Sequence, residues 1–169
     1  MEYLIIDAYN VINAWTDIFD LKRESLEECR DRFLNILSNY QGLNRTNIIV
    51  VFDAHLVKGS QLKEENFDGL TVVFTKEGET ADNYVERFVH KYSSMYTIRV
   101  VTSDYLEQRI VLGNGGVRMS PTELKNEVNK SNRGWGKYVE PSHSKTDDIM
   151  SRVKPEILEK LEKIRRSKV

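Results

Sequence analysis

Apolar residues occur along this chain in two alternating patterns: short continuous runs, and longer segments in which they recur every three or four positions. Continuous runs are typical of strands covered on both faces of a sheet, whereas the longer spacing is typical of helices. The runs predict strands at residues 3–6, 48–52, 70–74, 97–101 and 117–119. The longer segments predict helices at 8–15, 25–40, 80–92, 104–112, 121–129 and about 155–166.

Residues that typically begin and end helices support these bounds. Ser25 and Glu28 have the spacing of a capping box, and Gly42 is expected to end that helix. Pro121 follows a serine and suits the first helical position. The polar stretch 54–69 and the stretch 130–151 lack periodicity, so we expect both to be loops.

Strands that alternate with helices imply right-handed crossovers and a doubly wound sheet. We therefore predict an α/β fold with three layers (α/β/α) and a central, mostly parallel sheet. A length of 169 residues is typical of one domain, so we predict a single domain over residues 1–169. It would carry a basic loop at 130–151 and a charged C-terminal helix at about 155–166.

The composition is that of a globular protein, with 40% hydrophobic and 30% charged residues. No run approaches the roughly 18 apolar residues that would span a bilayer, so we expect no membrane partner. A single cysteine, Cys29, and no export signal indicate a cytoplasmic location. The composition leaves the oligomeric state open.

The net charge of −1 hides an uneven distribution. Residues 150–169 contain seven Lys or Arg and three Glu, a balance of +4, and the other residues carry −5. A basic tail on an acidic body favours a polyanionic partner. A charged helix in contact with solvent explains the tail equally well.

Four aspartates lie where predicted strands end or the following helix begins: Asp7, Asp53, Asp82 and Asp104. Each could simply cap a helix or begin a loop. The carboxyl ends of parallel strands, however, face one crevice, and four carboxylates there would repel one another unless a cation lay among them. The pattern predicts a divalent metal and chemistry on a phosphate.

Mg²⁺ prefers oxygen ligands and keeps several of its waters, so a few carboxylates suffice to bind it, and Mn²⁺ is the alternative. We assign Asp7, Asp82 and Asp104 as catalytic residues and metal ligands. Asp53 would complete the metal shell directly or through water. Asn10, three residues after Asp7, would orient a carboxylate or a phosphate oxygen.

Basic and aromatic residues alternate between positions 130 and 145. Bases stack on aromatic side chains while Lys and Arg neutralise phosphates, so this stretch could contact single-stranded RNA. Packing of its aromatic residues on the core is the alternative. The candidate substrate-binding residues here, with two arginines expected near the crevice, are Arg133, Trp135, Lys137, Tyr138, Arg109 and Arg118.

Several of these motifs together resemble a known family. Residues 7–12, DAYNVI, resemble the opening D-x-Y-N of NYN domains, relatives of the PIN-type nucleases. Further segments resemble the bacterial YacP-like branch of that family, over about residues 2–130: VFDA at 51–54, EGETAD at 77–82, TSD at 102–104 with Gln108, and GNGGVRMS at 113–120.

The resemblance implies a PIN-like fold and metal-dependent endoribonuclease activity, with association with mRNA on ribosomes. An aspartyl-nucleophile phosphohydrolase would need a second carboxylate two residues after Asp7, where Tyr9 stands. A non-catalytic RNA- or ribosome-binding module with a vestigial acidic cluster stays open as the alternative.

Overall fold

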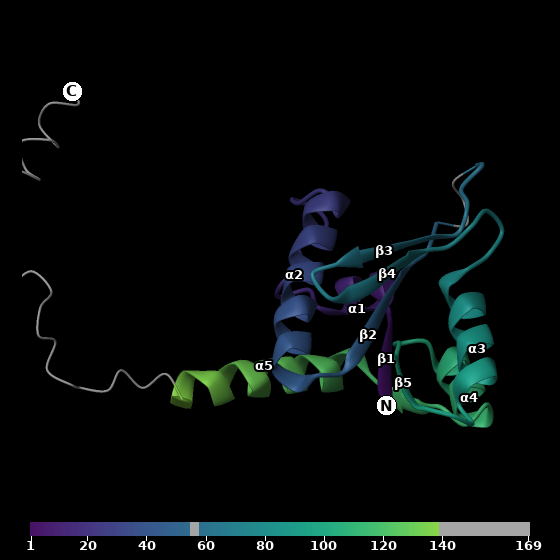
Figure 1. Ribbon diagram of the computed structural model, residues 1–169. Helices are drawn as coiled ribbons and strands as arrows, with labels where there is room; N and C mark the ends of the chain where they lie inside the picture. Colours follow the sequence, from purple (N-terminus) through teal and green to yellow (C-terminus); the bar gives the residue numbers. More distant parts are fainter. Residues whose placement is uncertain (55–57, 139–169) are drawn as a thin grey trace, which may run out of the picture. The chain divides into compact units, whose positions relative to one another are not determined.

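The computed structural model describes residues 1–54 and 58–138 of the chain (Figure 1). The chain forms two compact units, Met1–Gly134 and Trp135–Val169, and the whole sheet lies in the first. One domain over residues 1–169 stays a prediction, and the helix expected at 155–166 lies outside the described residues. None of the helices in the described ranges has both the length and the apolar character needed to cross a bilayer.

The first unit contains one six-stranded sheet in the order β3-β4-β2-β1-β5-β6 (Figure 1). Neighbouring strands are parallel except for the antiparallel pair β3 and β4. This confirms the predicted α/β fold with a mostly parallel central sheet. In chain order the elements are β1 Glu2–Asp7, α1 Ala8–Ala14, α2 Leu26–Asn44, β2 Asn47–Phe52, β3 Lys63–Phe67, β4 Leu70–Phe74, α3 Ala81–Tyr92, β5 Thr97–Val101, α4 Tyr105–Gly113, β6 Val117–Met119 and α5 Pro121–Tyr138.

Helices cover both faces of the sheet, which explains the continuous apolar runs. Successive side chains of a strand point to opposite faces. Leu4 and Ile6 of β1 therefore pack in the core beneath α1 and α2, whereas Ile5 packs with residues of α3. Figure 1 shows α1 and α2 on one side of the sheet and α3 and α4 on the other.

The helix boundaries follow the predicted caps with one correction. The capping box at the start of α2 is present, with the Ser25 backbone N–H donating to Glu28 Oε2 at 2.9 Å. Gly42, however, does not end α2, because the helix runs on to Asn44 and ends where Arg45 adopts a left-handed φ of 54°. A glycine inside a helix weakens it without breaking it.

Two predicted loops are partly regular structure. Residues 63–67, inside the expected loop 54–69, form β3, an edge strand with mostly exposed side chains, so it lacks the apolar signal of a buried strand. The helix predicted at 121–129 extends to Tyr138, so the described part of the expected basic loop is helical. Two glycines, at 134 and 136, had lowered the helical signal there. Residues 139–151 lie outside the described ranges.

The close approach of α3 and α4 at Gly116 gives a first prediction. An alanine Cβ at this position would lie 2.8 Å from Val111 Cγ1 and 3.1 Å from Val89 Cγ1, so neighbouring side chains would have to move. We expect Gly116→Ala to lower the free energy of unfolding, measured by urea titration, by about 1–3 kcal/mol.

Gly42→Ala is the matched control, because no atom lies within 4 Å of the added Cβ in α2. It should stabilise the protein by about 0.5–1 kcal/mol, since alanine favours the helix. Equal stabilities of Gly116→Ala and the wild type would show that α3 and α4 are not packed as closely as described.

Candidate active site

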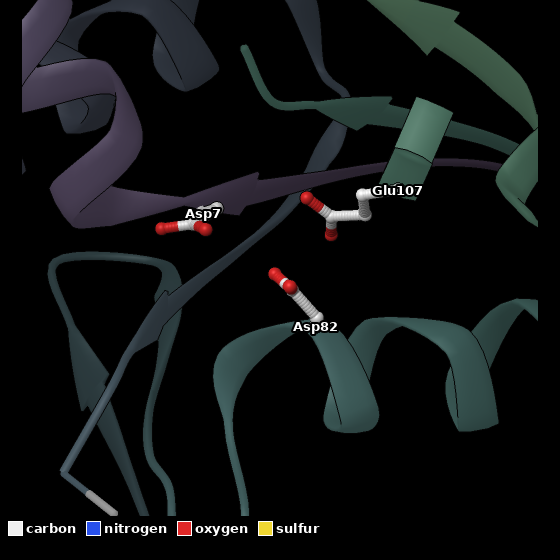
Figure 2. A group of neighbouring side chains, drawn as sticks. All are labelled: Asp7, Asp82 and Glu107. Carbon is white, nitrogen blue, oxygen red and sulfur yellow. The ribbon is translucent and has the colours of Figure 1, made fainter. Parts of the chain in front are cut away.

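Three carboxyl groups converge at one edge of the sheet: those of Asp7, Asp82 and Glu107. One oxygen from each lies within 4.8 Å of the other two. Figure 2 shows the three side chains pointing toward a common space from β1, α3 and α4. Asp7 and Glu107 are buried, and Asp82 lies at the surface.

The topology of the sheet brings these residues together. From β1 the chain moves to β2 and then to β4 on one side, and α3 leads it back to β5 on the other side of β1. A crevice forms where the strand order reverses, outside the carboxyl ends of the strands. Asp7 ends β1, Asp82 lies in the first turn of α3, and Glu107 lies in the first turn of the helix that follows β5.

Asn10 holds the Asp7 carboxylate in place. Its backbone N–H donates to Asp7 Oδ1 at 3.2 Å, and its side-chain Nδ2 donates to Asp7 Oδ2 at 2.8 Å. The Ser103 hydroxyl in turn donates to Asn10 Oδ1 and fixes the amide. Asn10 therefore orients a carboxylate, as its spacing indicated, and its contact with a phosphate stays a prediction.

Glu107 is the residue that the sequence analysis missed. Its side chain is buried, and neither carboxylate oxygen makes a hydrogen bond of normal geometry among the described residues, although the Thr102 side chain and the Asp82 carboxyl group lie close enough to interact with it. The available signal was its position four residues before Val111, on the buried face of α4. A glutamate on an inward-facing position needs a partner, because an unpaired buried charge is costly.

The surroundings of Asp7 and Asp82 oppose their ionisation. Burial raises the pKa of Asp7, and the charge of Asp53 adds to this, while the hydrogen bonds from Asn10 act in the opposite direction. Partial burial raises the pKa of Asp82, followed by the charges of Asp7 and Asp104.

The effect is largest at Glu107. Burial raises the pKa of Glu107 to about 8, and the charges of Asp82, Asp7 and Asp104 add to the effect of burial, while the Thr102 side chain opposes it. In the part of the chain that the structure describes, no Lys or Arg pairs with any of the three clustered carboxyl groups. The cluster is therefore negative and uncompensated when ionised.

A divalent cation fits this set of ligands. The donors are all carboxylate oxygens, which suit hard ions such as Mg²⁺ or Mn²⁺. The two buried oxygens of Glu107, which make no hydrogen bond of normal geometry in the described residues, are a specific indication, since coordination would satisfy them. The arrangement can thus bind a cation and present it to a substrate phosphate.

Asp53 and Asp104, the two other predicted ligands, lie beside this cluster and have local roles. Asp53 Oδ2 accepts a hydrogen bond from the Ala81 backbone at 3.4 Å, at the start of α3. Asp104 caps α4, with Oδ1 accepting from the backbone of Leu106 at 2.7 Å and of Glu107 at 3.3 Å. Coordination of a metal by either residue stays a prediction.

The predicted arginine contacts of the substrate have other neighbours or are exposed, and three further predicted residues lie outside the described side chains. The Arg109 guanidinium lies 6.0 Å from the centre of the Tyr105 ring, and Arg118 lies 4.0 Å from Glu123. Arg133 is exposed on α5. Trp135, Lys137 and Tyr138 occupy the last residues of that helix. Their contacts with RNA stay predictions.

A doubly wound sheet with acidic side chains gathered where its strand order reverses is the arrangement expected of a PIN-like domain. The model of the YacP-like NYN domain matches residues 4–166, and this chain belongs to that family. The family assigned from the motifs is thereby confirmed.

Three matches to Bacillus subtilis proteins support this assignment. The chain is 40% identical over 167 residues to the uncharacterized protein YacP of strain 168, covering 98% of both chains. It matches the crystal structure of Rae1 (YacP) with a TM-score of 0.70 and 39% identity, over 98% of this chain and 95% of that one. A tryptophan-to-leucine mutant of Rae1 also matches with a TM-score of 0.70, at 38% identity over 81% and 80% of the two chains.

The raised pKa of Glu107 predicts how stability depends on pH. The folded state binds the Glu107 proton more tightly than the unfolded state, so the metal-free protein should lose stability as the pH rises from about 4.5 to about 8. Each unit of raised pKa corresponds to about 1.4 kcal/mol. Glu107→Gln should reduce this loss, as measured by urea titration in chelator at pH 5 and pH 8.5.

Glu27→Gln is the control, because Glu27 lies in the first turn of α2, is exposed and is remote from the cluster. It should keep the wild-type pH dependence. Added Mg²⁺ at pH 8.5 should stabilise the wild type more than Glu107→Gln. Parallel pH profiles for the wild type and Glu107→Gln would contradict the burial of an uncompensated carboxyl group.

Proposed function

We propose that this protein is a divalent-metal-dependent endoribonuclease that hydrolyses phosphodiester bonds of RNA. One observation carries the proposal: carboxyl groups from three different elements converge within 4.8 Å, without a cationic partner among the described residues. A stable fold tolerates such repulsion where a bound cation relieves it. Membership of a family of PIN-like nucleases supports the same reaction.

The acidic residues and Asn10 would have different roles in this reaction. Asp7, Asp82 and Glu107 would hold the ion, with Asp104 and Asp53 completing its shell directly or through water. A bound Mg²⁺ or Mn²⁺ supplies an activated water and neutralises charge that develops on the phosphate. Asn10 keeps the Asp7 carboxylate in one orientation, which would preorganise it for holding an ion.

The substrate we propose is mRNA on the ribosome, in the cytoplasm. The body of the protein, residues 1–149, carries a charge of −5 and should bind free RNA weakly at physiological salt. The basic residues of the last 20 positions would dock on a larger RNA-containing assembly. The resemblance of the motifs to a family associated with mRNA on ribosomes supports the ribosome as that assembly.

Removal of a carboxylate from the cluster should abolish cleavage without unfolding the protein. Asp7→Asn and Asp82→Asn should each lower the cleavage rate of single-stranded RNA in Mg²⁺ by roughly a hundredfold or more, because the ion is held less tightly. Glu27→Gln, which removes a first-turn carboxylate from a different helix, should cleave like the wild type. RNA binding without cleavage by the wild type would instead favour the non-catalytic binding module.

Sedimentation tests the ribosome as partner. The full chain should pellet with ribosomes at 150 mM salt, roughly the physiological ionic strength. The double substitution Arg165→Ala, Arg166→Ala should weaken this several-fold. Lys22→Ala, Arg23→Ala removes the same charge from an exposed turn and should have little effect. If the wild type stays in the supernatant and cuts naked RNA rapidly, it acts as a free ribonuclease.

A further inference from the structure

A pocket of about 270 Å³ adjoins the acidic cluster, between α3 and α4. One part of its lining is acidic, with Asp82, Asp104 and Glu107, and another is apolar, with Leu106, Ile110 and Val111. We propose that this apolar wall is a nucleobase subsite, which holds the base next to the scissile phosphate. The inference rests on the proposed nuclease function and adds to it the part of the substrate that is recognised.

Two side chains of the apolar wall are exposed to solvent. Leu106 is 66% exposed and Ile110 is 42% exposed, and they lie four residues apart on α4. Large apolar side chains gathered at the rim of a charged site are typical of a surface that a ligand covers. Charged groups beside an apolar wall require a ligand with a phosphate and a flat, apolar part. A nucleotide has both.

The size of the pocket agrees with a single base. Pockets for whole small-molecule ligands measure roughly 300–1,000 Å³, and this one is slightly smaller. Proteins that act on single strands commonly place one unstacked base against apolar or aromatic side chains, because every base has a flat face. The phosphate attached to that base would then lie beside Asp82 and Glu107.

Two polar residues of α3 also line the pocket and could read the edge of the base. Within the described ranges, the Asn83 and Glu86 side chains make no hydrogen bond or ion pair, so their polar atoms are available. A carboxylate only accepts hydrogen bonds, whereas an amide both donates and accepts. Guanine offers an imino N–H next to an amino group, which suits Glu86. Uracil offers one N–H between two carbonyl oxygens, and these oxygens would be repelled by the Glu86 carboxylate.

Binding of mononucleotides tests the subsite without any cleavage. The full chain, with methyl groups labelled for NMR, is titrated with GMP and with UMP in the presence of Mg²⁺. The methyl signals of Leu106 and Ile110 should shift saturably, at lower concentrations of GMP than of UMP. Leu112 is 54% exposed on the same helix but does not line the pocket, so its methyl signals should not move.

Glu86→Gln should reduce the difference between GMP and UMP while leaving the methyl shifts in place. The absence of any saturable shift at Leu106 and Ile110 overturns the subsite. Equal shifts at Leu112 also overturn it, because they would indicate that the whole exposed side of α4 is contacted without use of the pocket.

Cleavage kinetics place the subsite relative to the cut. A series of single-stranded RNAs is prepared, each lacking the base at a different position near the cleavage site. The RNA that lacks the base bound in the subsite should be cut with kcat/KM lowered roughly tenfold, and the others should be cut like intact RNA. Leu106→Ala should lower kcat/KM on intact RNA by a similar factor. On the RNA that lacks this base, the same substitution should lower kcat/KM little further. Leu112→Ala should behave like the wild type on both substrates.

The outcomes separate the two proposals. If the wild type cuts RNA but tolerates removal of every base near the cut, the subsite is wrong and the nuclease function stands. If the wild type cuts no RNA with Mg²⁺ or Mn²⁺, the nuclease function fails, and the mononucleotide titration alone decides whether the pocket binds a base.

Discussion

Repulsion between carboxyl groups that share one crevice is the constraint on which the rest of this structure depends. The fold supplies cationic or hydrogen-bonding partners to other acids: half-buried Glu127 accepts hydrogen bonds from Tyr40 and Arg99, and buried Glu79 pairs with Arg87. Glu107 is equally buried and has no such partner in the described residues. Since the same chain provides a counter-charge to buried Glu79, the uncompensated charge here is a local property of the crevice, and a cation is the simplest means of relieving it.

The two apolar cores hold the crevice in shape against this repulsion. Strands β1, β2 and β5 are covered on both faces, so the edge from which Asp7 projects has little freedom to move. Gly116 leaves no room for a Cβ between Val111 of α4 and Val89 of α3, so these two helices, which carry Glu107 and Asp82, pack closely there. Sites on rigid elements keep their geometry well, which metal binding and in-line attack on a phosphate both require.

Helix α4 combines more of the proposed chemistry than any other described element. Its N-cap is Asp104, its first turn supplies Glu107 to the cluster, and Leu106 and Ile110 form the apolar wall of the adjoining pocket. This segment therefore contributes both acidic and apolar side chains to the pocket. A single rigid element that carries both surfaces would fix the distance between a bound base and the ion, which aligns the phosphate for attack.

The sequence by itself determined the alternation of strands and helices, the parallel α/β class, the family and the strand-end positions of Asp7 and Asp53, because apolar periodicity and motif spacing are properties of neighbouring residues. Only the tertiary structure decided which acids meet. Asp104 and Glu107 lie three residues apart at the start of α4, and the rotation of that helix directs Glu107 inward while Asp104 caps its N-terminus. Strand β3 also depended on tertiary pairing, because its exposed side chains leave backbone hydrogen bonds to β4 as its main support. Local patterns cannot report helix rotation or edge pairing, since both are set by contacts between segments distant in the chain.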